Sequence, residues 1–306
     1  MTRFPNLRLP VVVAPMFLVS GPAMVNAACR AGVIGAFPTP NCRTADELDA
    51  WMTQIVAQRG DGDAPWAVNL VTHSTNGRLA DDLELVARHK PPIVITALGS
   101  PRPAIEVVHG YGGIVLADVV TVALGRKAAA AGADGLVCVS AGAGGHTGML
   151  SPFAFITAIR QFFGGLVCVG GGIADGAAVA GAVAAGADLV YMGTRFLAAG
   201  ESMAVPEYKA MVVASAIEDL VISSAVTGTA ASWLRPSLVA AGHDPAAAAA
   251  PLKRDYGGDP AKQWRDLWAA GQGIGSVTTT EPVGAIVDQL KQEFDAAAMR
   301  LRGIVQ

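Results

Sequence analysis

The sequence is poor in charge, in aromatic residues and in cysteine. Of its 306 residues, 15% are charged and 6% are aromatic, and 22 basic and 25 acidic side chains give a formal net charge of −3. No block of like charge occurs, which argues against a nucleic-acid-binding protein and against a protein held at an anionic membrane. The low charge, together with 52% hydrophobic residues, also excludes a disordered chain.

The four cysteines, Cys29, Cys42, Cys138 and Cys168, form no Cys-x-x-Cys pair. Their scatter argues against a zinc site and against a disulfide framework, so we expect no metal and a reducing, cytoplasmic environment. Cys138 and Cys168 fall within apolar, strand-like runs, where a cysteine packs as a small hydrophobic residue.

A membrane span of about 20 apolar residues is also missing, although the mean hydropathy is +0.42. The longest uncharged stretch, between Asp134 and Arg160, contains five Gly, one Pro and one His, which are typical of loops. Residues 1–23 superficially resemble a signal peptide, but Pro10 and Pro15 interrupt the apolar run. A strand that leads into a turn explains this segment equally well, and we expect no membrane partner.

The chain is rich instead in short apolar runs bounded by Gly or Pro, alternating with Ala-rich segments. Continuous apolar runs of this length predict strands covered on both faces. The predicted strands are Val11–Ala14, Val33–Phe37, Trp66–Leu70, Ile93–Ala97, Gly113–Ala117, Gly135–Val139, Leu166–Gly170 and Asp188–Met192. The predicted helices between them are Pro22–Ala31, Thr44–Gln58, Arg78–His89, Val119–Ala131, Pro152–Phe162 and Asp175–Ala185.

This alternation predicts an α/β fold, most simply a (β/α)8 TIM barrel, with a doubly wound open sheet as the competing interpretation. A weak internal repeat supports the alternation. Gly32, Gly132 and Gly186 each follow Ala in an Ala-Gly pair between a predicted helix and the next strand. Glycine adopts the left-handed conformation at a helix end at little cost, so the recurrence indicates helix-to-strand corners.

The pattern changes after the eighth predicted strand. We expect residues 1–200 and 271–306 to form the barrel and residues 201–270 to form a helical insertion beside its mouth. Within the insertion the helix-like segments are Glu207–Ser215, Asp244–Pro251 and Gln263–Ala270, without clear strands. A final helix, Pro282–Leu301, closes the fold.

Two glycine-rich loops follow the last two predicted strands. The first runs from Gly170 to Gly176 and opens a helix with Asp175 as a candidate N-cap, and the second contains Gly193 and Thr194. Either loop alone is most simply a tight turn. At adjacent strand ends of a barrel, however, they predict a phosphate site, because backbone N–H groups and a helix N-terminus favour anions.

His146 lies among small residues in the loop after the sixth predicted strand, within Ser140–Gly148. An imidazole exposed to a ligand there can act as a base or as a hydrogen-bond donor near neutral pH. The alternative is a His that caps the following helix or binds a backbone carbonyl. His73, after the third strand, is a weaker candidate for contacting substrate.

Three further segments complete the predicted ring of loops. After the first strand, Pro15 fixes the backbone and Met16 is a candidate to lie against an aromatic ring; core packing is the alternative for Met16. The Asn69 amide, at the end of the third strand, can pair with a heterocycle or cap a turn. The Gly-rich Ala270–Gly275 segment can pass close to a bound group.

In order and spacing, the segments APMF, WAVNL, SAGAGGHTG, GGGIADG, YMGTRFLA and AGQGIG resemble the FMN-dependent nitronate monooxygenase family, formerly called 2-nitropropane dioxygenases. The resemblance covers nearly the whole chain, and GGHTG, GGGIADG and MGTRF are its most specific parts. It implies a TIM barrel that holds FMN at the carboxyl ends of its strands without a metal. It further implies that alkyl nitronates are oxidised by O₂ to a carbonyl compound and nitrite. Whether nitroalkanes are also substrates is left open.

The resemblance also implies roles for single residues. His146 takes the place of the family's catalytic histidine, which orients a nitronate or takes a proton from a nitroalkane. The FMN phosphate is expected at Gly171, Gly172, Gly193 and Thr194. Contacts with the rest of the cofactor are expected from Ala14, Pro15, Met16, Asn69, Gly145, Gln272 and Gly273.

One position departs from the family. Several relatives carry a basic residue after the fifth strand, where this chain has Asp118. The lost cation would change how a reduced, anionic flavin is stabilised, and it leaves the substrate open. The alternative functions are an NAD(P)H-dependent enoyl-CoA, enoyl-ACP or quinone reductase on the same barrel, and a non-catalytic flavin-binding barrel. The oligomeric state is also open, a homodimer included.

Overall fold

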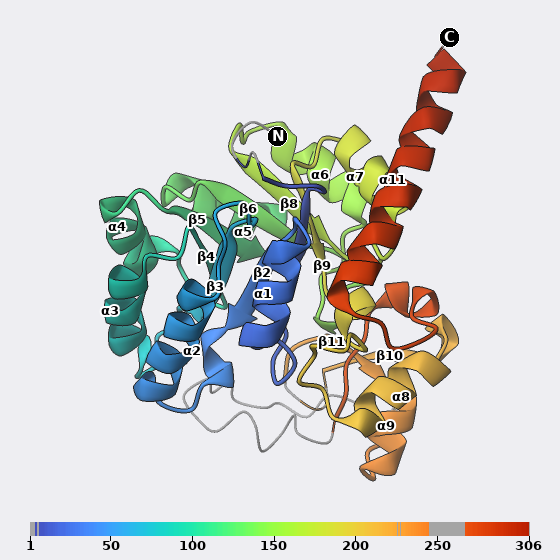
Figure 1. Ribbon diagram of the computed structural model, residues 1–306, viewed down its shortest axis with the longest axis horizontal. Helices are drawn as coiled ribbons and strands as arrows, with labels where there is room; N and C mark the ends of the chain where they lie inside the picture. The colour runs from blue at the N-terminus through green and yellow to red at the C-terminus, as the bar shows by residue number, and fades with distance from the viewer. Residues whose placement is uncertain (1–3, 5, 225, 227, 245–266, 306) are drawn as a thin grey trace.

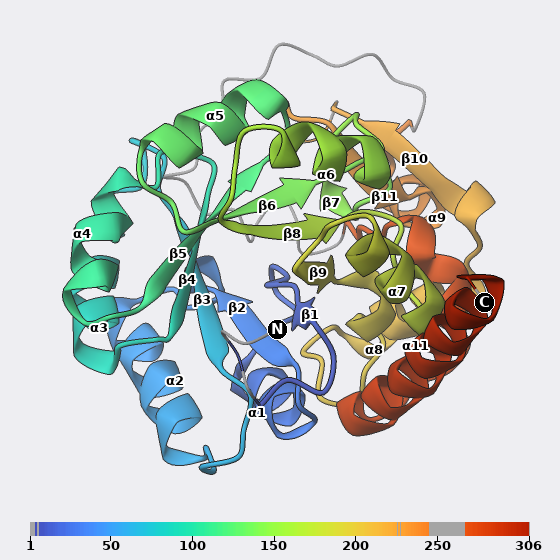
Figure 2. The ribbon, with the colours of Figure 1, turned by 90° about the horizontal axis from the view of Figure 1, so that it is seen from above.

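The computed structural model describes residues 4, 6–224, 226, 228–244 and 267–305. In this part of the chain, eight parallel strands close into a barrel, as Figures 1 and 2 show. The barrel closes where β1 pairs with β9, with Val12 opposite Tyr191. The predicted TIM barrel is confirmed. Its strands are β1 (Val11–Val13), β2 (Ile34–Pro38), β3 (Trp66–Val71), β4 (Ile93–Ala97), β5 (Ile114–Val119), β6 (Gly135–Val139), β8 (Leu166–Gly170) and β9 (Leu189–Met192).

Helices surround the barrel in the order of the chain, and α11 takes the place of the helix after the last strand (Figure 2). In Figure 1 the carboxyl end of α11 extends beyond the barrel. The surrounding helices are α1 (Pro22–Arg30), α2 (Ala45–Ala57), α3 (Leu79–His89), α4 (Arg102–Gly110), α5 (Val122–Ala130), α6 (Pro152–Arg160), α7 (Gly176–Ala184) and α11 (Val283–Val305). Short 3₁₀ helices are η1 (Thr39–Asn41), η2 (Thr194–Phe196), η3 (Ile217–Asp219) and η4 (Gln272–Ser276).

Local sequence signals set the helix ends. Thr44 and Glu47 form a capping box at the start of α2, with the Glu47 N–H donating to Thr44 Oγ1 at 3.1 Å. At the helix-to-strand corners, Gly32, Gly132 and Gly186 have φ angles of 85°, 99° and 108°. These angles lie in the region that favours glycine, so the corner prediction is confirmed.

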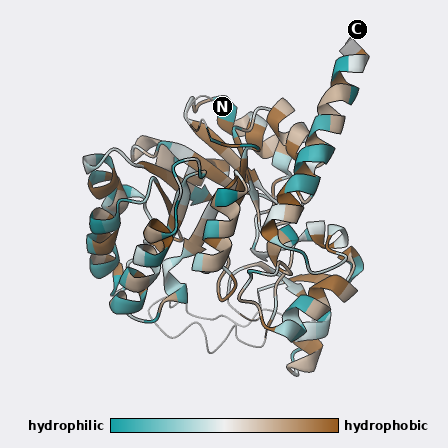
Figure 3. Cartoon of the chain, viewed as in Figure 1, coloured by the Kyte–Doolittle hydropathy of each residue, from teal (hydrophilic) through white to brown (hydrophobic). Residues whose placement is uncertain are grey.

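The core has two layers. The barrel interior contains alternate residues of the strands, among them Ile34, Ile95, Leu116, Val137 and Cys168, all at most 1% exposed. The opposite strand faces pack against the helices. Figure 3 shows mostly hydrophobic strands, and helices such as α3 and α11 on which hydrophilic and hydrophobic residues alternate. Among the helices that the structure describes, none combines the length and apolar character needed to cross a membrane.

The described part of the insertion contains the helices α8 (Pro206–Ala214) and α9 (Arg235–Ala240). The expectation that it lacks strands was wrong. Antiparallel β10 (Leu220–Ser223) and β11 (Ala231–Leu234) join β7 (Gly145–His146) in a small sheet.

The predicted helix over Gln263–Ala270 was also wrong for its described part, because Ala269 instead forms a β-bridge with Trp233. Residues 263–266 and nearly all of the predicted helix Asp244–Pro251 lie outside the described residues.

A third correction concerns Asp118, which was expected just after the fifth strand. Strand β5 continues to Val119, because Asp118 and Val119 remain in parallel register with Val137 and Cys138 of β6. Asp118 therefore belongs to the barrel wall.

Candidate active site at the barrel mouth

The loop after β1 lies against the loop after β9. A Cβ added at Gly193 would come 3.4 Å from the sulfur of Met16 and 3.6 Å from the Cβ of Ala14. Gly193 is thus brought close to Ala14 and Met16, which precede it by nearly 180 positions. The sequence analysis assigns all three residues to the same site. This is the arrangement expected where the first and last strands of a closed barrel meet.

The segment after the insertion interlocks with these loops. The N–H of Gly271 donates to Thr194 Oγ1 at 2.9 Å, and the N–H of Gln272 donates to the carbonyl of Gly142 at 2.9 Å. A Cβ at Gly273 would come 2.3 Å from the Cβ of Ala174. The predicted Gln272 and Gly273 therefore adjoin the glycine loops after β6, β8 and β9.

Backbone geometry selects among the predicted phosphate donors. Gly171 and Gly172 have φ angles of 135° and 68°, so both need glycine. The N–H of Gly172 donates to Gly142 at 3.1 Å, whereas the N–H groups of Gly171 and Gly193 have no acceptor among the described residues. Gly171, Gly193 and the Thr194 hydroxyl are therefore the best-placed donors for an anion.

The N-terminus of α7 is already satisfied by carboxylates. Asp175 caps the helix as predicted, accepting a hydrogen bond from the N–H of Ala178 at 2.6 Å. The N–H of Gly176 donates to Glu293 on α11 at 2.7 Å. Because these carboxylates already accept hydrogen bonds from the first turn of α7, only the loop that precedes the helix is left to bind phosphate.

The sequence analysis did not identify the residues that shape the β1 loop. Asn41 donates to the carbonyls of Met16 and Ser20 at 3.1 and 2.7 Å and accepts from the N–H of Leu18 at 2.8 Å. These bonds hold Leu18 at a φ of 60°, which is unusual for a residue with a side chain. Asn41 lies in a 3₁₀ turn after β2, and no local pattern in the sequence indicates its distant partners.

His146 is half-buried in β7, where it pairs with Ala231 of β11. The adjacent Thr147 N–H donates to the carbonyl of Ala230 at 3.2 Å. The insertion thus fixes the backbone that carries His146 and its neighbour Gly145. The alternative that His146 caps the following helix is wrong, because Ser151 caps α6.

Asn69 and Asp118 face the interior of the barrel near the carboxyl ends of their strands, because they alternate with the core residues Ala67 and Leu116. The Asn69 amide donates to the carbonyl of Ile95 at 3.3 Å and is 7% exposed. Asp118 Oδ1 is buried without a hydrogen-bond partner in the described part of the chain. Burial raises the pKa of this carboxyl to about 7.

His73 is held within its own loop. Its Nδ1 lies 2.9 Å from Thr75 Oγ1, and the Thr75 N–H donates to the same nitrogen at 3.3 Å. The contacts that join the glycine loops to one another do not include His73, so its proposed contact with substrate stays a prediction.

A buried network behind the phosphate loops was also missed. Arg195, 3% exposed, donates to Glu281 at 2.9 Å and to Gln289 at 2.8 Å. Gln289 donates to Glu293 at 2.9 Å, which accepts from the N–H of Gly176. Arg195 follows Thr194 directly, so this network joins the loops after β8 and β9 through α11.

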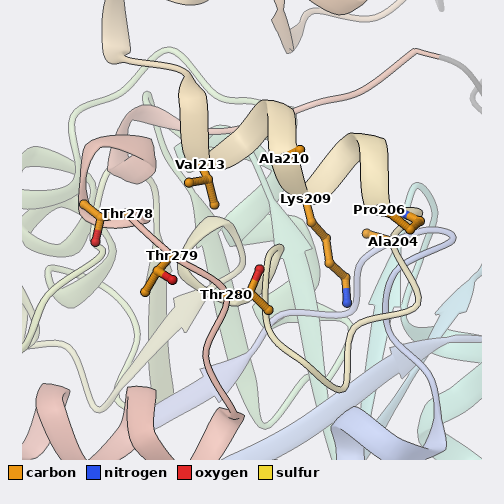
Figure 4. A pocket seen from close by; sticks show the side chains of 8 residues that line it. All are labelled: Ala204, Pro206, Lys209, Ala210, Val213, Thr278, Thr279 and Thr280. Carbon is orange, nitrogen blue, oxygen red and sulfur yellow. The ribbon is translucent and has the colours of Figure 1, made fainter.

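A surface cavity of about 440 Å³ lies elsewhere, between α8 and residues 278–280 (Figure 4). Its lining includes Lys209 and three threonines, and the Lys209 ammonium donates to the carbonyl of Ala199 at 2.8 Å. No residue predicted for the site lines this cavity.

Comparisons with known proteins agree with this architecture. Among solved structures, FabK from Thermotoga maritima has a TM-score of 0.80 and 26% identity over 98% of this chain and 96% of that chain. A nitroalkane oxidase from Streptomyces ansochromogenes has a TM-score of 0.80 and 25% identity over 97% of this chain and 98% of that chain.

A curated relative from Mycobacterium tuberculosis is named (3aS,4S,5R,7aS)-5-hydroxy-7a-methyl-1-oxo-octahydro-1H-indene-4-carboxyl-CoA dehydrogenase. It is 29% identical over 242 residues, which cover 78% of this chain. The chain spans 66% of that protein's length, slightly less than two thirds.

The sequence model of the nitronate monooxygenase family matches residues 67–293, which include nearly all of β3, the elements from there to β9, the insertion and the first half of α11. The names of the family and of two of these relatives, an oxidase and a dehydrogenase, describe oxidoreductases. The chain belongs to the nitronate monooxygenase family.

Proposed function

We propose that the protein is an FMN-dependent oxidase of alkyl nitronates that uses O₂ and releases a carbonyl compound and nitrite. One observation carries the proposal. The loops after β1, β6, β8 and β9 interlock at one end of the barrel with His146 beside them. Family membership and the likeness to a nitroalkane oxidase support the choice of substrate.

The residues present fit FMN. The N–H groups of Gly171 and Gly193 and the Thr194 hydroxyl would bind the phosphate, while Met16 and Asn69 would contact the ring system. A Cβ at Gly171 would come 2.6 Å from the carbonyl of Ala141, so only glycine allows the loop this close packing. The flavin, when bound, supplies the electron chemistry, and the protein supplies position and electrostatics.

His146 is the proposed catalytic residue. Its backbone is fixed by β11 on one side and by the glycine-rich loop after β6 on the other. An imidazole there can donate a hydrogen bond to an anionic nitronate, or take a proton from the carbon beside a neutral nitro group. Holding the substrate in one orientation is a large part of what a positioned donor contributes to the rate.

The test compares nitrite release by wild-type protein loaded with FMN and by His146→Ala. The variant should lose about 10²–10⁴-fold in turnover while still binding FMN, since general acid–base groups contribute on that scale. His109→Asn is the matched control, because His109 lies at the end of α4, on the opposite face of the barrel. Equal turnover of His146→Ala and wild type would overturn the proposed role.

A second candidate function is redox chemistry on a CoA thioester. The likeness to a carboxyl-CoA dehydrogenase over 78% of this chain favours it. In the form of an NAD(P)H-dependent enoyl-CoA or enoyl-ACP reductase, it predicts that NADH or NADPH reduces the bound flavin rapidly in the absence of O₂. A nitronate oxidase need not react with a nicotinamide.

A further inference from the structure

Asp118 is an acidic side chain in the wall of a barrel whose interior is largely apolar. It occupies the last inward-facing position of β5, after Ile114 and Leu116, which belong to the interior core. Its partner across the ladder is Val137 of β6. The carboxyl group therefore lies inside the barrel, toward the mouth where the glycine loops meet.

The groups that face Asp118 are neutral. Across the barrel, burial first and then the nearby Asp118 carboxyl raise the pKa of the Tyr191 phenol well above its usual range. Burial is also the main reason that the pKa of the Cys168 thiol is raised. The neighbouring strands β4 and β6 contribute the apolar Ile95 and Val137 to the interior. Asp118 consequently has no cation to stabilise its ionised form among the described residues.

The hydrogen bonding of Asp118 also fails to stabilise its ionised form. Its Oδ1 atom is buried and has no partner among the residues that the structure describes. A buried polar atom without a partner costs about 1–3 kcal/mol, and more when it carries charge. Among the buried unpaired side-chain atoms of the described residues, only that of Asp118 belongs to a barrel strand, where a group bound at the mouth would complete its hydrogen bonding.

We propose that Asp118 is a proton-carrying residue beneath the bound flavin, and that it takes up a proton from solvent when the flavin is reduced. The inference rests on the proposed flavin-dependent function. Two electrons pass to the flavin from the substrate or a chemical reductant, and one proton passes from water to the Asp118 carboxylate. The neutral acid then donates a hydrogen bond through the oxygen that is otherwise unpaired.

The coupling follows from electrostatics. A reduced flavin carries additional negative charge, and a like charge nearby disfavours an ionised carboxylate. The pKa of Asp118, already raised to about 7 by burial, should therefore rise further on reduction. At a pH between the pKa of Asp118 beside the oxidised flavin and its pKa beside the reduced flavin, reduction of the flavin and protonation of Asp118 occur together.

The test is the midpoint potential of the bound flavin as a function of pH. A tenfold change in proton activity shifts a two-electron couple by about 30 mV for each proton taken up. Just above pH 7, the wild-type slope should exceed that of Asp118→Asn by about 30 mV per pH unit, because asparagine cannot titrate. Asp288→Asn, on the exposed surface of α11, should keep the wild-type slope.

A measurement on the wild type avoids dependence on the folding of the variant. Infrared difference spectra of the FMN-loaded protein, labelled with ¹³C-aspartate, should gain a protonated carboxyl band on reduction at pH 8. The inference would be overturned if the FMN-loaded wild type showed the same dependence of midpoint potential on pH as Asp118→Asn and no protonated carboxyl band. The proposed function would still stand in that case. Wild type that cannot bind FMN would overturn both.

Discussion

The guanidinium of Arg195 donates a hydrogen bond to the carboxylate of Glu281 at 2.9 Å, across 86 positions of the chain. Arg195 is 3% exposed, whereas Glu281 is 27% exposed, so the guanidinium is buried and the carboxylate retains contact with water. The ion pair connects the loop after β9 to the segment before α11, and α11 in turn contacts the N-terminus of α7 through Glu293. The two proposed phosphate loops are therefore positioned by a common support.

Replacement of Arg195 by Met should weaken both the fold and the cofactor site. The substitution removes the hydrogen bonds of Arg195 to Glu281 and Gln289 and should cost about 1.5–3 kcal/mol, because Glu281 is partly exposed to water. Urea unfolding measures this loss, and fluorescence titration should show weaker FMN binding. Asp288→Ala removes an exposed pair with Arg8 from the same helix and should cost less than about 1 kcal/mol. Equal losses in the two variants would contradict the supporting role of Arg195.

Two glycine substitutions should separate folding from binding. Gly171→Ala places a side chain at a φ of 135° and 2.6 Å from a backbone carbonyl, so it should destabilise the protein by about 2 kcal/mol or more. Gly193 has a φ of −106° and meets only ordinary contacts, so Gly193→Ala should fold normally. A methyl group beside its N–H should nevertheless weaken FMN binding about tenfold. Unchanged affinity in Gly193→Ala would argue against this phosphate donor.

Asp118 should make the stability depend on pH. The pKa of an aspartate in the unfolded chain is about 4, whereas burial raises the folded value to about 7. The stability contributed by the neutral acid is present below pH about 4 and is lost as pH rises to about 7. In the protein without FMN, Asp118→Asn should therefore be more stable than wild type by about 4 kcal/mol at pH 8, and this advantage should fall below about 1 kcal/mol at pH 4.5. Parallel pH profiles from urea unfolding would contradict the titration of a buried Asp118.

The barrel could be predicted because its signals are local. Most strands are continuous apolar runs, and glycines such as Gly132 and Gly186 occur where a helix must end and a strand begin. Once a barrel is predicted, its topology places the loops after all strands at the same end. The proximity of Gly193 to Met16 confirms this for the loops after β9 and β1.

What could not be predicted depends on distant partners. Strand β11 is four residues long and pairs with the two-residue β7, too short a pattern to be recognised in the sequence. Arg195 and Asn41 have no local feature that indicates their hydrogen bonds. The apolar run of the fifth predicted strand ends at Ala117, whereas the ladder with β6 extends that strand through Asp118 to Val119.

Anaerobic mixing of the FMN-loaded protein with an alkyl nitronate tests the central claim most directly, with NADH and NADPH mixed separately. Loss of the oxidised flavin absorbance should follow addition of the nitronate, and O₂ should then restore it with release of nitrite. His146→Ala should retain FMN but be reduced far more slowly. Rapid reduction of the flavin by a nicotinamide and not by the nitronate would contradict the account.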